Sequence, residues 1–135
     1  DLSVSNPFIG VENFNTYQTR AALYSAMGKN AEANTQMDKA IKDPGATVQD
    51  IHQYGRSLLN SGQKEKAMEV FKFNAQKNPQ DKFTPNVGLA RAYTAAGDKK
   101  NAIKYWELAL KNIPENQKQF LPQYEGEIKK LKDSK

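Results

Sequence analysis

The sequence predicts an all-α protein: an α-solenoid of three helix–turn–helix repeats closed by a C-terminal capping helix. Three segments share one pattern, in which a small or apolar helix, a glycine and an alanine precede an aromatic residue or Met. They begin at residues 17, 51 and 86 and read YQTRAALYSAMGKNAEANTQMDKAI, IHQYGRSLLNSGQKEKAMEVFKFNA and NVGLARAYTAAGDKKNAIKYWELAL. Their glycines, Gly28, Gly62 and Gly97, recur at intervals of 34 and 35 residues, and such a fixed period is typical of repeat proteins.

Turn-forming and helix-breaking residues set the expected helix ends. Each of the three glycines can adopt positive φ and so ends a first helix. Pro79 and Pro114 end the second helices, because proline lacks an N–H donor and crowds the preceding turn. The expected helices cover residues 13–27, 30–42, 48–61, 64–77, 85–96, 99–111 and 118–132. We therefore divide the chain into repeats at 13–47, 48–82 and 83–116, a capping helix with tail at 117–135, and a leading segment at 1–12.

Small and large side chains recur in step, which predicts a core shared by neighbouring helices. The alanines allow close approach of the two helices of a repeat, and the larger side chains meet where the helices cross. The expected contact pairs are Tyr24 with Met37, Leu58 with Phe71, and Tyr93 with Trp106. The full predicted core is Tyr24, Gly28, Ala33, Met37, Leu58, Gly62, Ala67, Phe71, Tyr93, Gly97, Ala102 and Trp106. In the capping helix, the apolar stripe consists of Phe120, Tyr124, Ile128 and Leu131.

On these residues the chain resembles the tetratricopeptide repeat from Asn13 to Asn116. The clearest match is the third repeat, at Leu89, Ala90, Tyr93, Gly97, Ala102, Trp106, Ala109 and Pro114. The resemblance implies a non-enzymatic, protein-binding fold without a cofactor. Family members that grip the C-terminal carboxylate of heat-shock proteins use a clamp of Lys and Asn. The matching positions here hold Gln18, Ala22, Gln53, Thr84 and Gly88, so that particular role is not expected. The chain also departs from the family at Arg20 and Asn74, where apolar or small residues are usual.

Few residues could carry catalysis. The 135 residues include no Cys and one His, which excludes disulfides, thiolate catalysis and Cys-based zinc sites. We expect the single His52 to be exposed in the groove, since a metal site would need further ligands. The carboxylate pairs Glu65/Glu69 and Glu125/Glu127 lie among lysines and are expected to be solvated. The sequence therefore predicts no enzyme, no metal and no cofactor. No apolar run is long enough to cross a bilayer.

The net charge of +5 comes mainly from lysine, which supplies 17 of the 20 basic residues. Most lysines alternate with acidic or apolar residues, whereas nucleic-acid surfaces more often cluster arginine with exposed aromatics. Nucleic-acid binding is therefore disfavoured, and a basic surface for nucleic acid or membranes is the third of three hypotheses.

The leading hypothesis is a protein–protein interaction module that presents a concave groove to a peptide or partner domain. Helical phase places six polar side chains on the inner face: Gln18, His52, Gln53, Arg56, Asn60 and Arg91. Arg56 and Arg91 share one column in successive repeats, and arginine has a planar set of donors suited to carboxylates. An acidic peptide or a C-terminal carboxylate would fit them. The alternative is that both arginines pair with Asp50 or neighbouring Glu side chains and bind nothing.

The second hypothesis is a structural appendage that packs on an upstream domain of the same chain. The chain opens with Asp1 rather than Met, and we expect it to be a piece of a longer protein. Residues 1–12 form either an arm that packs Phe8 and Ile9 over the first helix or the end of a truncated preceding repeat. Two segments, NPFIGVENFNTYQTRAAL and DIHQYGRSLLNSGQKEKAMEVFKFNAQKNP, resemble the C-terminal repeats of exported bacterial proteins of unassigned function. That resemblance implies a periplasmic or cell-envelope location.

Overall fold

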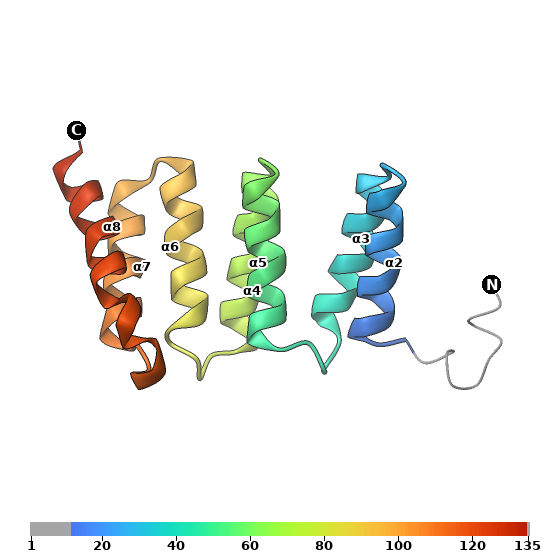
Figure 1. Ribbon diagram of the computed structural model, residues 1–135, viewed down its shortest axis with the longest axis horizontal. Helices are drawn as coiled ribbons and strands as arrows, with labels where there is room; N and C mark the ends of the chain where they lie inside the picture. The colour runs from blue at the N-terminus through green and yellow to red at the C-terminus, as the bar shows by residue number, and fades with distance from the viewer. Residues whose placement is uncertain (1–11, 135) are drawn as a thin grey trace. The chain divides into compact units, whose positions relative to one another are not determined.

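The computed structural model describes residues 12–134, which form α-helices and one 3₁₀ helix and contain no β-strand (Figure 1). The chain divides into two compact units between Thr47 and Val48. Unit 1 precedes this point and unit 2 follows it. The predicted packing of Phe8 and Ile9 over the first helix, and the alternative of a truncated repeat, lie outside the described residues.

Unit 1 is a helical hairpin of α2 (Phe14–Ala26) and α3 (Asn30–Lys42) (Figure 1). Its core is thin and made largely of alanine. The buried apolar residues are Phe14, Ala21, Ala33, Ala40, Ile41 and Ala46. Tyr24 and Met37, predicted to fill the crossing, are only half-buried. The N-terminal ion pair of unit 1 joins Arg20 to Glu12 at 2.8 Å.

Unit 2 holds two further helical hairpins and the capping helix. Along the chain these are α4 (Val48–Asn60), α5 (Lys64–Lys77), α6 (Thr84–Ala96), α7 (Lys99–Lys111), the 3₁₀ helix η1 (Glu115–Phe120) and α8 (Leu121–Asp133). Each helix packs on the next one in sequence, and α4 also packs against α6. A first helix of unit 2 is therefore covered on two sides, once by its own partner and once by a neighbouring hairpin.

The three glycine turns have one geometry. Gly28, Gly62 and Gly97 have φ values of 76°, 83° and 79°. In each turn the residue after the glycine donates its backbone N–H to a carbonyl near the end of the first helix, as from Lys29 to Tyr24 at 2.8 Å. The equivalent bonds run from Gln63 to Leu58 at 2.9 Å and from Asp98 to Tyr93 at 3.0 Å. This is the Schellman arrangement, which needs the left-handed backbone that glycine adopts without strain. The repeated glycine pattern therefore corresponds to a repeated turn.

The first six helices begin and end within one residue of their predicted bounds. The seventh was predicted at 118–132, but α8 begins at Leu121 and a 3₁₀ helix occupies Glu115–Phe120. The reason is Pro122, which lies in the first turn of α8. Proline is tolerated there, whereas deeper in a helix its ring would clash with the carbonyl four residues earlier. Phe120, predicted as part of the apolar stripe, consequently lies outside α8 and is 39% exposed.

Unit 2 is held together by the ring of Phe71, which lies between two glycines on different helices. Phe71 is fully buried on α5. A Cβ atom added at Gly55 of α4 or at Gly88 of α6 would lie less than 3.0 Å from carbons of the Phe71 ring. Both helices therefore approach α5 at a position where only glycine fits. Gly88 and its neighbour Val87 are buried, because α5 covers that side of α6.

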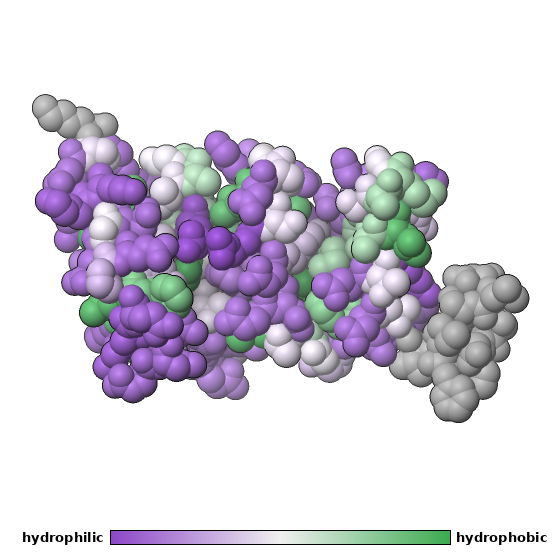
Figure 2. Space-filling model, viewed as in Figure 1, coloured by the Kyte–Doolittle hydropathy of each residue, from purple (hydrophilic) through white to green (hydrophobic). Residues whose placement is uncertain are grey.

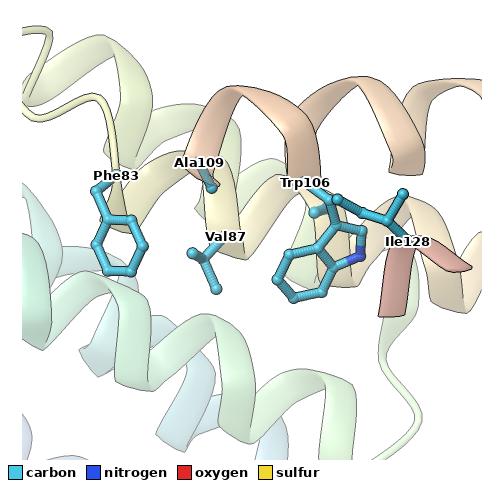
Figure 3. Close-up of a cluster of buried hydrophobic side chains, with 6 residues drawn as sticks. Phe83, Val87, Trp106, Ala109 and Ile128 are labelled. Carbon is cyan, nitrogen blue, oxygen red and sulfur yellow. The ribbon is translucent and has the colours of Figure 1, made fainter. Parts of the chain in front are cut away.

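A second cluster closes the far end of unit 2 around Trp106 (Figure 3). It brings together Phe83, the N-cap residue of α6, and one or two residues from each of α6, α7 and α8: Val87, Ala90, Trp106, Ala109 and Ile128. Trp106 stacks on Tyr124 of α8 with ring centroids 5.3 Å apart. Its predicted partner Tyr93 stacks instead on Tyr105, at 5.5 Å. The capping helix thus packs on the indole through Tyr124 and Ile128, two residues of the predicted apolar stripe.

Asn74 is a polar residue in this core at a position where the repeat usually has alanine. It is fully buried on α5, and its Nδ2 donates to the backbone carbonyl of Val48, at the start of α4, at 3.1 Å. Its Oδ1 accepts from Asn78 Nδ2 at 2.8 Å. Both ends of the amide are satisfied, so its burial carries little penalty.

Alanine substitution at two helical glycines should have opposite effects. Gly88→Ala should destabilise unit 2 by about 1–3 kcal/mol, because overpacking against Phe71 outweighs the better helix propensity of alanine. Gly126→Ala on α8 is the matched control, since a Cβ there meets nothing within 4 Å. It should stabilise by about 0.5–1 kcal/mol. Urea unfolding followed by circular dichroism measures both changes. Equal effects at the two sites would contradict the Phe71 contact.

Replacing the indole tests the closing cluster. Trp106 is 1% exposed, and Trp106→Ala should lower the free energy of unfolding by about 3–5 kcal/mol. Leu108 lies two residues further along the same helix and is 36% exposed. Leu108→Ala should therefore cost less than about 1 kcal/mol. Thermal and urea unfolding of the two variants provide the comparison, and a small loss at Trp106 would place the indole outside the core.

Candidate functional site

Three of the predicted groove residues, Arg56, Asn60 and Arg91, line a pocket in unit 2. The pocket has a volume of about 240 Å³ and is formed by side chains of α4, α6, α7 and α8. Its lining residues are Arg56, Leu59, Asn60, Arg91, Thr94, Ala95, Trp106 and Glu127. This volume lies below the range of about 300–1,000 Å³ typical of pockets for drug-sized ligands. The pocket therefore has room for about one side chain of a partner.

Arg56 and Arg91 reach this pocket because they occupy equivalent positions on equivalent helices. Arg56 lies on α4 and Arg91 on α6, each six residues before the glycine that ends its helix. Since α4 packs against α6, the repeat brings the two side chains to one pocket, as the shared column predicted. Within residues 12–134 neither guanidinium has an ion-pair partner within 4.0 Å. The predicted alternative, pairing with Asp50 or a neighbouring Glu, is not what these residues form.

Arg91 is held against the indole. Its Cζ lies 5.5 Å from the centroid of the Trp106 ring, a cation–π arrangement. Its Nε is buried without a hydrogen-bond partner among the described residues. Burial and the charge of Arg56 lower the pKa of Arg91, while Tyr124 and Glu127 act against this shift. The pocket thus contains a partly desolvated guanidinium beside a second one, with donor capacity that the described residues leave unused.

His52 was predicted to be exposed in the groove, and this prediction is wrong. Its side chain is 6% exposed and packs on Phe71 with ring centroids 5.6 Å apart. The physical reason is that α4 contacts α6 as well as α5, so the buried face of α4 is wider than one helical hairpin requires. Burial, followed by the charges of Arg56 and Arg91, lowers the pKa of His52 to about 4. His52 is therefore a neutral core residue at pH 7.

The remaining predicted groove residues fall into separate places. Asn60 is exposed and lines the pocket with the two arginines. Gln53 is exposed on α4 but does not line the pocket. Gln18 is exposed on α2 in unit 1. Figure 2 shows that hydrophilic side chains cover most of the visible face of unit 2.

Two contributions from α8 were not anticipated. Glu127 was expected to be a solvated surface carboxylate, but it lines the pocket and its side chain is 36% exposed. Tyr124 was expected only to pack on the core, yet it also acts on Arg91. Neither could be found from the repeat pattern, because α8 is not part of a repeat and its start depends on Pro122. Glu125, the other member of the predicted pair, is exposed and lines a second pocket instead.

That second pocket, of about 640 Å³, lies between α7 and α8. It is lined by three acidic and three basic side chains: Glu107, Lys111, Glu125, Lys129, Lys132 and Asp133. An ion pair at 3.6 Å joins Lys132 to Glu107 across it. Within residues 12–134 no group of three or more His, Asp or Glu side chains is placed to hold a metal ion. Nor does any helix of that range combine the length and apolarity needed to span a bilayer.

The helices, turns and pocket define a helical-repeat protein. Residues 86–116, in the third repeat, match the family model of the tetratricopeptide repeat, so the chain carries a tetratricopeptide repeat there. This fold is generally non-enzymatic and serves protein–protein interaction. No curated protein matches the chain. The narrower resemblance to exported bacterial proteins therefore finds no support, and the bacterial origin and envelope location stay predictions.

The depressed pKa of His52 predicts a pH dependence of stability. The unfolded chain binds a proton at His52 near pH 6.5, whereas the folded chain does so only near pH 4. The stabilising contribution of neutral His52 is therefore complete above about pH 6.5 and is lost as the pH falls toward 4. Between pH 7.5 and pH 4.5 the wild type should lose about 2–3 kcal/mol more than His52→Gln. Urea unfolding at both pH values measures this difference. Parallel losses would show that His52 titrates normally.

Proposed function

We propose that the chain is a protein-interaction module in which unit 2 binds an acidic segment of a partner through Arg56 and Arg91. One observation carries the proposal: two arginines from equivalent positions of successive hairpins line one pocket without an ion-pair partner among the described residues. Unpaired guanidiniums that share a partly desolvated pocket repel one another, and a carboxylate between them relieves that repulsion.

The chemistry around the arginines supports an acidic ligand over a purely apolar one. Arginine offers donors in a planar fork that matches a carboxylate, and hydrogen bonds between charged groups are stronger than neutral ones. Asn60 and Thr94 add polar groups at the edge of the pocket, and Leu59 and Ala95 add apolar contact. Exposed Gln53, on the same helix as Arg56, extends the polar surface beyond the pocket. This combination suits an extended peptide with one acidic side chain seated between the arginines.

Two predictions from the sequence, a groove role for Gln18 and a structural appendage, are not part of this proposal. Gln18 lies in unit 1, and binding by unit 2 does not depend on it. The alternative of a structural appendage on an upstream domain stays a prediction.

The proposal is tested with a terminally blocked peptide in which glutamates alternate with alanines, and with its glutamine analogue. Trp106, the only tryptophan, reports binding through its fluorescence because it lines the pocket. The double variant Arg56→Ala/Arg91→Ala should weaken binding of the acidic peptide at least about tenfold, since each charge-assisted bond contributes about 1.5–3 kcal/mol. The glutamine analogue should bind weakly to every protein.

The matched control is Lys64→Ala/Lys72→Ala, which removes the same charge from exposed positions on α5 that line neither pocket. Its affinity should fall only slightly, and less at 0.5 M salt than at low salt. If both double variants lose affinity equally, the attraction is a general effect of net charge and Arg56 and Arg91 are not the site.

A further inference from the structure

Glu127 is the one acidic side chain that lines the pocket with Arg56 and Arg91. We infer that Glu127 lowers the affinity of this pocket for acidic partners, as a fixed negative charge that competes with the ligand carboxylate for the two arginines. The inference rests on the proposed function and assigns to α8 a role in setting which ligands the pocket accepts.

The position of Glu127 fits a competitor better than a structural partner. Within residues 12–134 it has no ion pair with either arginine inside 4.0 Å. Its one ion pair is with Lys130 at 4.0 Å, and the lysine side chain is 80% exposed, so this pair contributes little to stability. Glu127 is therefore near enough to act on Arg91 but does not saturate its donors. The buried Nε of Arg91 still lacks a hydrogen-bond partner.

Charge and space together make the competition unavoidable. A pocket of about 240 Å³ brings a bound carboxylate close to every charge that lines it. Two positive charges attract that carboxylate and Glu127 repels it, at distances where partial burial weakens screening by solvent and salt. Because the repulsion acts only when a ligand carboxylate is present, Glu127 limits acidic ligands and leaves neutral ones unaffected.

Two alternative roles for Glu127 fit its position less well. Glu127 does not serve the core, since its side chain is 36% exposed while Ile128 beside it is buried. It is not among the acidic and basic side chains that line the pocket between α7 and α8. Its contacts point instead to the arginine pocket, on a face of α8 that carries Tyr124 against Trp106.

The test compares Glu127→Gln with Glu125→Gln, its matched control. Both remove one negative charge from α8, but Glu125 lines the other pocket. The probe is a terminally blocked peptide with one glutamate flanked by alanines, titrated by Trp106 fluorescence at low salt. Glu127→Gln should bind it about three- to tenfold more tightly than the wild type. Glu125→Gln should match the wild type.

Two further experiments separate a local effect of Glu127 from an effect of net charge, and a side-chain carboxylate from a C-terminal one. The double variant Glu127→Gln/Lys130→Gln restores the wild-type net charge, and it should keep the increase in affinity because the effect is local. A blocked peptide with glutamine in place of glutamate, and the same peptide with a free C-terminal carboxylate, show whether a side chain or a chain end occupies the pocket.

The outcomes distinguish this inference from the proposed function. If Arg56→Ala/Arg91→Ala abolishes binding but Glu127→Gln and Glu125→Gln are indistinguishable, the inference is overturned and the proposed function stands. If the arginine variant binds normally, or if no variant binds any acidic probe at low salt, both are overturned. Tighter binding by Glu127→Gln alone supports the inference.

Discussion

The contact on which unit 2 depends is the insertion of the Phe71 ring between Gly55 and Gly88. A side chain on either glycine would meet the ring at less than 3.0 Å, so α4 and α6 can both approach α5 closely only because neither carries a Cβ at that point. This double approach brings α4 against α6. It also explains why His52 and Val87 are buried, although each lies on the side of its helix that a single hairpin would leave exposed. A packing requirement of the core therefore determines how near the first helices of successive hairpins lie.

The same approach creates the electrostatic character of the pocket. Arg56 directly follows Gly55 on α4, and Arg91 lies three residues after Gly88 on α6. Because Phe71 brings these two helices together, the two arginine side chains line one pocket. Two guanidiniums without acidic partners, one of them partly desolvated, are costly to a folded protein. Stacking of Arg91 on Trp106 and the nearby Tyr124 and Glu127 offset part of that cost. The buried Nε of Arg91 still lacks a hydrogen-bond partner among the described residues. Selection for stability alone would not retain such an unsatisfied donor, and this is the physical basis of the binding proposal.

The repeat pattern predicted the elements well because it encodes local chemistry. Glycine turns with positive φ, proline terminators and alanines at helix crossings act within a few residues, and the six helices that they bound lie where expected. The sequence was less informative where a residue depends on a third helix. His52 appears exposed on a helical wheel of one hairpin and is buried by two neighbours. Glu127 belongs to α8, whose start at Leu121 is set by Pro122 and not by the repeat period. The column of arginines was visible, whereas the carboxylate beside it was not.

The capping helix α8 consequently has two roles: it closes the core of unit 2, and it contributes a charge to the arginine pocket. Ile128 and Tyr124 close the apolar end of unit 2 by covering Trp106, which is the role that an amphipathic end helix plays in any repeat array. The helical phase that turns Tyr124 and Ile128 toward the indole also turns Glu127 toward the arginine pocket, because residues three apart share a face. Closure of the core and the charge of the pocket are therefore coupled through one helix. A change in the seating of α8 on Trp106 would alter both the stability of unit 2 and the electrostatic environment of Arg91, although α8 carries neither arginine.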